Sequence, residues 1–159
     1  NMDEPLATVS EELRHLKNYL FVMNVRTQNG LHLTLDIPQE ALEARVPRLS
    51  LQPLVENAVN HGLRDKRGEK RIALKAQCAQ DRLFITVEDN GVGMDEATIA
   101  SALTYDPDSI LVSRSIGLRN INARVKLLFG EKYGLSIESR VGEGCRVILC
   151  IPKRGDEHA

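Results

Sequence analysis

Apolar residues recur along this 159-residue chain at two spacings, one typical of helices and one typical of strands. Over residues 10–26 they lie three to four positions apart, which predicts a capped amphipathic helix. Over residues 31–37 they alternate with polar residues, which predicts a half-buried strand that Pro38 closes. The helical spacing returns over residues 49–63 and predicts a second long helix.

The rest of the chain shows short strand patterns and two further helical patterns. The expected elements are strands over 71–78 and 82–88, a helix from Asp95 to Leu103, a mobile loop over 104–115, a helix from Gly117 to Phe129, and a hairpin of strands 135–139 and 146–151. Strands that follow one another directly favour antiparallel pairing. The sequence therefore predicts an α/β (α+β) two-layer sandwich, with a mixed, largely antiparallel sheet and helices on one face.

Composition and charge narrow the class of protein. The chain is 42% hydrophobic and 27% charged, which is typical of one globular domain. Its 21 basic and 22 acidic residues give a net charge of −1, which argues against a general nucleic-acid binder. Three cysteines without C-x-x-C spacing make no disulfide framework and indicate a reducing, cytoplasmic compartment. No apolar run approaches the roughly 18 residues that span a bilayer.

Polar residues on the 49–63 helix form the first candidate site. Asn57, Asn60 and His61 are three and four positions apart, so their side chains share one face of a helix. A neutral amide on this face, beside the carboxylate of Glu56, can offer oxygen ligands to a hard cation such as magnesium, and phosphates would complete the coordination shell. The alternative is an ordinary solvated helix face.

Two glycine-containing segments form the other candidates. Asp89 ends a predicted strand, where its carboxylate can accept hydrogen bonds from an exocyclic amine, and Gly91 and Gly93 let the backbone approach a flat ring. The alternative for this segment is an ordinary turn. Ser115 and Gly117 precede the next helix, whose first amides favour a phosphate. The alternative there is that Gly117 only relieves crowding at the helix start.

These segments, in this order, resemble the nucleotide-binding boxes of GHKL ATPases. Residues 51–62, Leu-Gln-Pro-Leu-Val-Glu-Asn-Ala-Val-Asn-His-Gly, resemble the N box in the form found in LytS-like sensor histidine kinases. Residues 89–94, Asp-Asn-Gly-Val-Gly-Met, resemble the G1 box, and residues 116–121 resemble the following glycine box. The resemblance continues to the Gly-Glu-Gly hairpin at 142–144 and so covers nearly the whole chain.

The resemblance implies a Bergerat-type GHKL fold with ATP and Mg2+ as cofactors. It places magnesium on Asn57, adenine on Asp89, and a lid over roughly residues 104–115. The residues it implies for ATP binding are Asn57, Asn60, His61, Asp89, Gly91, Gly93, Met94, Ser115, Gly117, Leu118, Arg119 and Cys145.

The chain departs from the family pattern at several positions. Ser115 stands where related kinases often have a glycine, and Cys145 stands where many relatives carry a threonine near adenine. Pro53 occupies the position of the glutamate that activates water in the hydrolysing branches, so fast ATP hydrolysis is not expected. The acceptor motif His-Phe-Leu-Phe-Asn is absent, and His15 does not match it, so we expect His15 to be a surface residue.

The resulting hypothesis is the ATP-binding catalytic domain of a two-component sensor histidine kinase. We expect a helical lead-in over 1–28, the ATP-binding domain over 29–153 and a polar tail over 154–159. The implied partners are ATP, the upstream dimerisation and acceptor helices, a response regulator and, in the full-length protein, a second copy; no nucleic acid is expected. The domain would be cytoplasmic in a bacterial inner-membrane protein. The alternatives are a stand-alone serine kinase of the anti-sigma-factor type and a catalytically inactive nucleotide-binding module.

Overall fold

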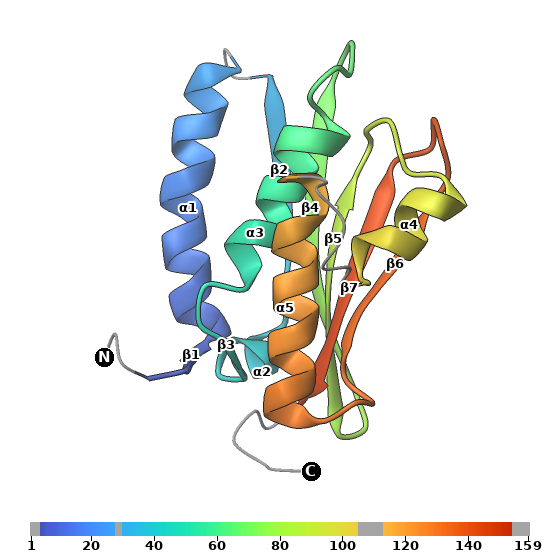
Figure 1. Ribbon diagram of the computed structural model, residues 1–159. Helices are drawn as coiled ribbons and strands as arrows, with labels where there is room; N and C mark the ends of the chain where they lie inside the picture. The colour runs from blue at the N-terminus through green and yellow to red at the C-terminus, as the bar shows by residue number, and fades with distance from the viewer. Residues whose placement is uncertain (1–3, 28–29, 105–112, 154–159) are drawn as a thin grey trace.

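The computed structural model describes residues 4–27, 30–104 and 113–153, with the backbone alone over 113–116 (Figure 1). Its elements are β1 (Leu6–Thr8), α1 (Val9–Arg26), β2 (Leu31–Asp36), α2 (Gln39–Leu42), β3 (Arg45–Pro47), α3 (Leu51–Asn57), the π-helix η1 (Ala58–Gly62), β4 (Lys70–Ala79), β5 (Arg82–Asp89), α4 (Glu96–Ala102), α5 (Ser113–Phe129), β6 (Gly134–Ser139) and β7 (Cys145–Pro152). None of the helices in these ranges has the length and apolarity needed to cross a membrane.

Five strands form one mixed sheet in the order β2-β4-β5-β7-β6. Strands β4, β5, β7 and β6 pair antiparallel with their neighbours, as the hairpin patterns predict. Strand β2 pairs parallel with β4, because α2, β3 and α3 lie between them in the chain and carry it back to the starting edge. The mixed, largely antiparallel sheet is therefore confirmed.

Helices α1, α3 and α5 lie side by side on one face of this sheet (Figure 1). Alternate residues of β5, Leu83, Ile85 and Val87, are buried against that helix layer. The opposite face carries charged side chains, such as the Glu88 carboxylate 2.9 Å from the Arg146 guanidinium. The predicted two-layer sandwich with helices on one face is confirmed.

The helix that carries the predicted magnesium ligand is shorter and less regular than the sequence predicts. It begins at Leu51 rather than at residue 49, because Leu49 has a φ of 62°, which no α-helix contains. After Asn57 the chain turns into the π-helix η1, where the amide of Leu63 bonds to the carbonyl of Ala58, five residues earlier. Such π-turns are rare and occur often at functional sites.

Helix α5 begins at Ser113, four residues before the predicted start at Gly117. The prediction took the glycine as the helix start, but serine and arginine cost little in a helix, and the helix extends through them. The first amides of α5 therefore belong to residues near Ser113 and not to Gly117. Most of the predicted lid lies outside the described residues, as does the polar tail over 154–159.

Smaller elements escaped prediction altogether. Strands β1 and β3 are three residues each and pair antiparallel, with Leu6 opposite Pro47. Helix α1 follows β1 directly, and the hydroxyl of Thr8 caps it by accepting a hydrogen bond from the amide of Glu11. His15 is exposed on α1, as expected.

Candidate functional site

The N-box residues line a small cavity between the α3 and η1 segment and the α5 helix. The cavity has a volume of about 120 Å³. Its lining consists of Pro53, Glu56, Asn57, Asn60, His61, Gly117 and Leu118. The fold thus brings the predicted N box and glycine box together, although 56 positions separate Leu118 from Gly62 in the sequence.

Asn57 is the most distinctive side chain of this cavity. It is one of few buried polar residues, with 6% of its surface exposed. Its Oδ1 atom is buried and accepts no hydrogen bond from any described residue. An unsatisfied buried acceptor is costly, so this oxygen fits a site where a ligand or a cation supplies the missing partner.

The donor set suits magnesium only if phosphates contribute to its coordination. No group of three or more His, Cys, Asp and Glu residues within the described ranges is placed to hold a metal. Magnesium in nucleotide sites commonly has one or two protein ligands and completes its shell with phosphate and water oxygens. The single amide oxygen of Asn57, with Glu56 in the same lining, fits that pattern.

The predicted set of ATP-binding residues omits two residues of this cavity. Glu56 lines it, and its Oε1 accepts a hydrogen bond from Gln52 Nε2 at 2.8 Å. Pro53 also lines it, and a Cβ placed on Gly117 would lie 3.6 Å from the Cβ of Pro53. The sequence signal for both was the N box itself, in which Pro53 lies four positions and Glu56 one position before Asn57.

Asp89 lies at the end of β5, where it is opposite Ile72 of β4 and Cys145 of β7. Its Oδ1 accepts a hydrogen bond from the amide of Gly91 at 2.8 Å. Cys145 is buried beside it, so these two predicted adenine contacts are brought together. Both also line a larger hollow of about 620 Å³, whose many charged side chains suit a flat aromatic ring poorly.

Glycines connect Asp89 to the N box. A Cβ on Gly62, the last residue of η1, would lie 2.8 Å from both carboxylate oxygens of Asp89. A Cβ on Gly91 would lie 1.9 Å from the carbonyl oxygen of Gly62, to which the amide of Val92 donates a hydrogen bond. These contacts are possible only without side chains, so the two glycines hold the N box directly against the strand end.

The segment after Gly91 is fixed to the final hairpin. Gly93 has a φ of 74°, and a Cβ there would lie 2.0 Å from the carbonyl oxygen of Arg140. The amide of Met94 donates to Ser139 Oγ at 2.8 Å, and the Met94 side chain is buried in the core. Gly93 and Met94 therefore support the wall of the site rather than line the cavity of Asn57.

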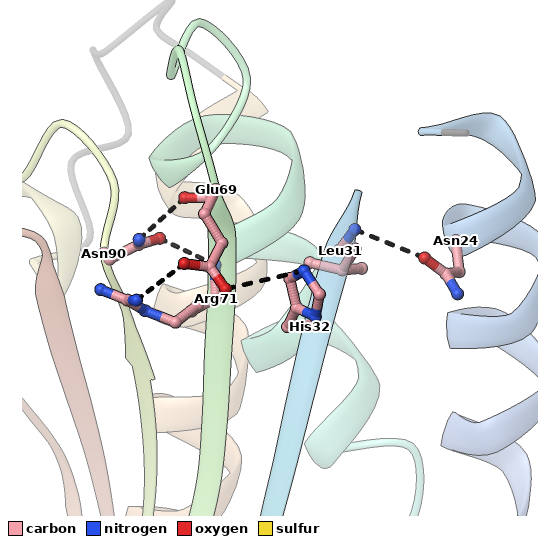
Figure 2. Close-up of polar contacts among 6 residues, drawn as sticks. All are labelled: Asn24, Leu31, His32, Glu69, Arg71 and Asn90. Carbon is pink, nitrogen blue, oxygen red and sulfur yellow. Dashed lines mark hydrogen bonds and ion pairs between the residues drawn. The ribbon is translucent and has the colours of Figure 1, made fainter. Parts of the chain in front are cut away.

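Asn90 ties the same segment to the start of β4 (Figure 2). Its side chain accepts a hydrogen bond from the amide of Arg71 at 2.8 Å and donates one to the carbonyl of Glu69 at 2.9 Å. The Glu69 carboxylate in turn lies 2.9 Å from Arg71 and 3.6 Å from His32 of β2. Asn90, which directly follows Asp89, is thus held at the start of β4.

The remaining predicted site residues lie apart from the cavity of Asn57 or outside the description. Arg119 lines a different cavity with Leu103 and Lys126, and its Nη1 donates to the carbonyl of Thr104 at 3.3 Å. The backbone of Ser115 is helical, and its side chain is outside the described residues. The structure therefore gathers Asn57, Asn60, His61, Gly117 and Leu118 in one place, with Asp89, Gly91 and Cys145 adjoining.

Known proteins are similar to this chain in sequence. The sequence model of the histidine kinase-, DNA gyrase B- and HSP90-like ATPases matches residues 43–155. The sensor histidine kinase YesM of Bacillus subtilis is 36% identical over 98% of the chain, and the sensor histidine kinase BtsS of Escherichia coli is 29% identical over 98%. The chain spans about a quarter of the length of these two relatives, 26% in each.

Solved structures agree with the fold. The nucleotide-free catalytic domain of the histidine kinase ThkA superposes with a TM-score of 0.68 at 17% identity, covering 94% of this chain and 96% of that one. A histidine kinase domain from Erythrobacter litoralis superposes with a TM-score of 0.61 at 18% identity, covering 95% and 66%. Both the predicted GHKL resemblance and the predicted fold are confirmed. Because the family match covers well over half of its residues, the chain belongs to the histidine kinase-, DNA gyrase B- and HSP90-like ATPases.

Proposed function

We propose that this chain is the ATP-binding catalytic domain of a sensor histidine kinase, which positions Mg·ATP for transfer of the γ-phosphoryl group to a histidine outside the chain. The observation that carries the proposal is the buried, unpartnered oxygen of Asn57 in a cavity that adjoins Asp89 through Gly62. The names of the relatives, which are sensor histidine kinases, support the same function.

Two ends of the site would recognise two ends of the nucleotide. Asp89 would accept hydrogen bonds from the exocyclic amine of adenine, while Asn57 would hold magnesium, with Asn60 and His61 on the phosphate side. A cavity of about 120 Å³ is smaller than a nucleotide site, roughly 300–1,000 Å³, so it suits the metal and phosphates alone. Bound magnesium would neutralise charge that develops on the phosphates.

The lining favours transfer to a histidine over hydrolysis. Pro53 supplies no base to activate water, and Gln52 holds the carboxylate of Glu56 by a hydrogen bond. An incoming imidazole is already a nucleophile, so the site needs mainly to position the reactants. A stand-alone serine kinase and an inactive nucleotide-binding module are the alternatives that an experiment has to exclude.

The proposal extends to the longer protein to which such a domain belongs. Its partners would be the acceptor helices of the same kinase, a response regulator and a second copy of the kinase. The domain would lie on the cytoplasmic side of a bacterial inner membrane. The sensor kinases among the relatives, in which this region is only 26% of the length, support this extension.

Incubation with γ-labelled ATP tests the function. We expect the chain alone to bind ATP, to carry no acid-labile label and to hydrolyse ATP more slowly than roughly 1 s⁻¹, the lower end of ordinary enzyme turnover. Addition of a separate protein with the acceptor helices should transfer label to that protein slowly, because the covalent link that gives a high effective concentration is missing. Label on the chain alone, or faster hydrolysis, would contradict the proposal, and absence of ATP binding would remove it.

A further inference from the structure

Glu12 of α1 is a buried acid that the proposed reaction does not use. Only 3% of its surface is exposed. Its Oε1 accepts hydrogen bonds from the backbone amides of Ser50 at 2.9 Å and Leu51 at 3.4 Å. Ser50 is the N-cap residue of α3 but makes no side-chain capping bond of its own. The start of α3 is therefore capped by a residue 38 positions earlier in the chain.

The same helix also reaches the other end of α3. Tyr19 lies two turns after Glu12, and burial, followed by the negative charge of Glu56, raises its pKa to about 12. Glu56 directly precedes Asn57, and both line the cavity of the candidate site. Helix α1 therefore binds the first amides of α3 and places Tyr19 near enough to Glu56 to be affected by its charge.

Stability alone gives a weak reason for an acid at position 12. A buried carboxylate has a large desolvation penalty, which is repaid only if both oxygens find partners. Oε2 of Glu12 is buried without a hydrogen-bond partner among the described residues. An apolar residue of similar size would fill this part of the core without that penalty, so the specific contribution of Glu12 is its contact with the start of α3.

We propose that Glu12 is a positioning residue for Asn57. Its carboxylate fixes the start of α3, and α3 is one short helix of seven residues that ends at Asn57. The inference rests on the proposed function, because it assumes that Asn57 serves Mg·ATP. Glu12 lies outside residues 43–155, which the family model matches, so a segment outside that range would tune metal-dependent nucleotide binding.

Three variants of the whole chain test the role. Glu12→Met removes the acceptor but keeps the length of the side chain, and Glu12→Gln keeps one acceptor oxygen for the amide of Ser50. Ile151→Val is the control, because Ile151 is fully buried at the end of β7 farthest from Cys145. Titration calorimetry with ADP, in magnesium and in a chelator, gives the ratio of the two affinities, and thermal unfolding reports stability.

We expect Glu12→Met to lower the magnesium-dependent gain in ADP affinity about 10-fold, the lower end of the effect of residues that support metal ligands. Affinity without magnesium should change less than about twofold, because the residues that line the hollow beside Asp89 include none from α1. Glu12→Gln should recover most of the magnesium-dependent gain. Ile151→Val should show the wild-type ratio of affinities even if it lowers the stability of the chain.

Two results would overturn the role of Glu12. One is a wild-type ratio in Glu12→Met, and the other is an equal drop of the ratio in Ile151→Val. If Glu12→Met does not fold, Glu12→Asp decides, because it keeps the charge but draws the carboxylate back from the amides of Ser50 and Leu51. A lowered ratio in Glu12→Asp supports the role, and a wild-type ratio overturns it. A wild-type chain without magnesium-dependent ADP binding would instead defeat the proposed function itself.

Discussion

Substitution of Gly62 by alanine should disable the site through one added methyl group. The new Cβ would lie 2.8 Å from both carboxylate oxygens of Asp89 and 2.9 Å from its Cγ, closer than Cβ atoms in real proteins approach other heavy atoms. The backbone on either side is fixed, since the Gly62 carbonyl accepts from the amide of Val92 at 2.9 Å. The carboxylate is the more movable group, so it should rotate out of its place.

The size of the effect follows from the contact that Asp89 would lose. A hydrogen bond to a charged group contributes about 1.5–3 kcal/mol when its loss leaves a partner unpaired. That range corresponds to ADP binding about 10-fold to 150-fold weaker. Asp89→Asn should show a similar loss, because an amide replaces one acceptor oxygen with a donor.

Titration calorimetry with ADP on four proteins measures this. They are the wild type, Gly62→Ala, Asp89→Asn and the double variant. If both substitutions remove the same contact, the double variant should bind ADP no more weakly than the weaker single variant, whereas independent effects would add. Gly68→Ala is the control, because Gly68 has a φ of 87° with no atom within 4 Å of its added Cβ. It should reduce stability and leave ADP affinity unchanged.

Wild-type ADP affinity in Gly62→Ala would refute this role of Gly62. Additive losses in the double variant would refute it equally, because the two residues would then act on different contacts. A loss of affinity in Gly68→Ala as large as in Gly62→Ala would show that general strain, and not the Asp89 carboxylate, is responsible.

Three further outcomes are expected. Asn57→Ala should abolish the magnesium-dependent part of ADP binding and spare the rest; calorimetry with and without chelator checks this, and equal losses in both would refute it. Asn90→Ala should lower the free energy of unfolding by about 1–3 kcal/mol in urea titrations, since it removes two hydrogen bonds, to Glu69 and Arg71. The raised pKa of Tyr19 means that the folded chain holds the phenolic proton more tightly than the unfolded chain, so its contribution to stability is complete below pH 10 and is lost as the pH rises through about 12. Tyr19→Phe should remove that alkaline loss of stability in unfolding measured against pH.

The strands of the sheet were predicted well because each one depends on the residue types within a short stretch of sequence. In β5 the β-branched and aromatic residues of the run from Leu83 to Val87 favour a strand, and its alternate residues Leu83, Ile85 and Val87 are buried against the helices. The cap of α4 is equally local, because Asp95 accepts a hydrogen bond from the amide of Thr98, three positions later, at 2.8 Å. Such features depend on neighbours within four positions, which a single sequence displays.

Boundaries that depend on the tertiary environment were harder to predict. The local pattern predicts a helix start at Gly117, but in the structure Gly117 lies in the second turn of α5, where the helix passes close to Pro53. The π-turn after Asn57 has no local signature either, because Val59 and Asn60 suit an α-helix nearly as well. In both places α3 and α5 pack against each other, and the cavity lies where they meet.

The contacts that complete the site join residues far apart in the chain, and the sequence alone predicts such contacts least well. Glu12 and Ser50 are 38 positions apart, and on the sequence Glu12 is one of two acids at the start of an amphipathic helix, where acids are expected for reasons of helix dipole alone. In the structure the two acids differ in burial: the side chain of Glu11 is 47% exposed, whereas Glu12 is buried against another helix. Because a local rule already explains both residues, only the observation that one of them caps α3 reveals a second role. The same holds for Gly62, which on the sequence ends a motif and in the structure leaves the space that the Asp89 carboxylate occupies.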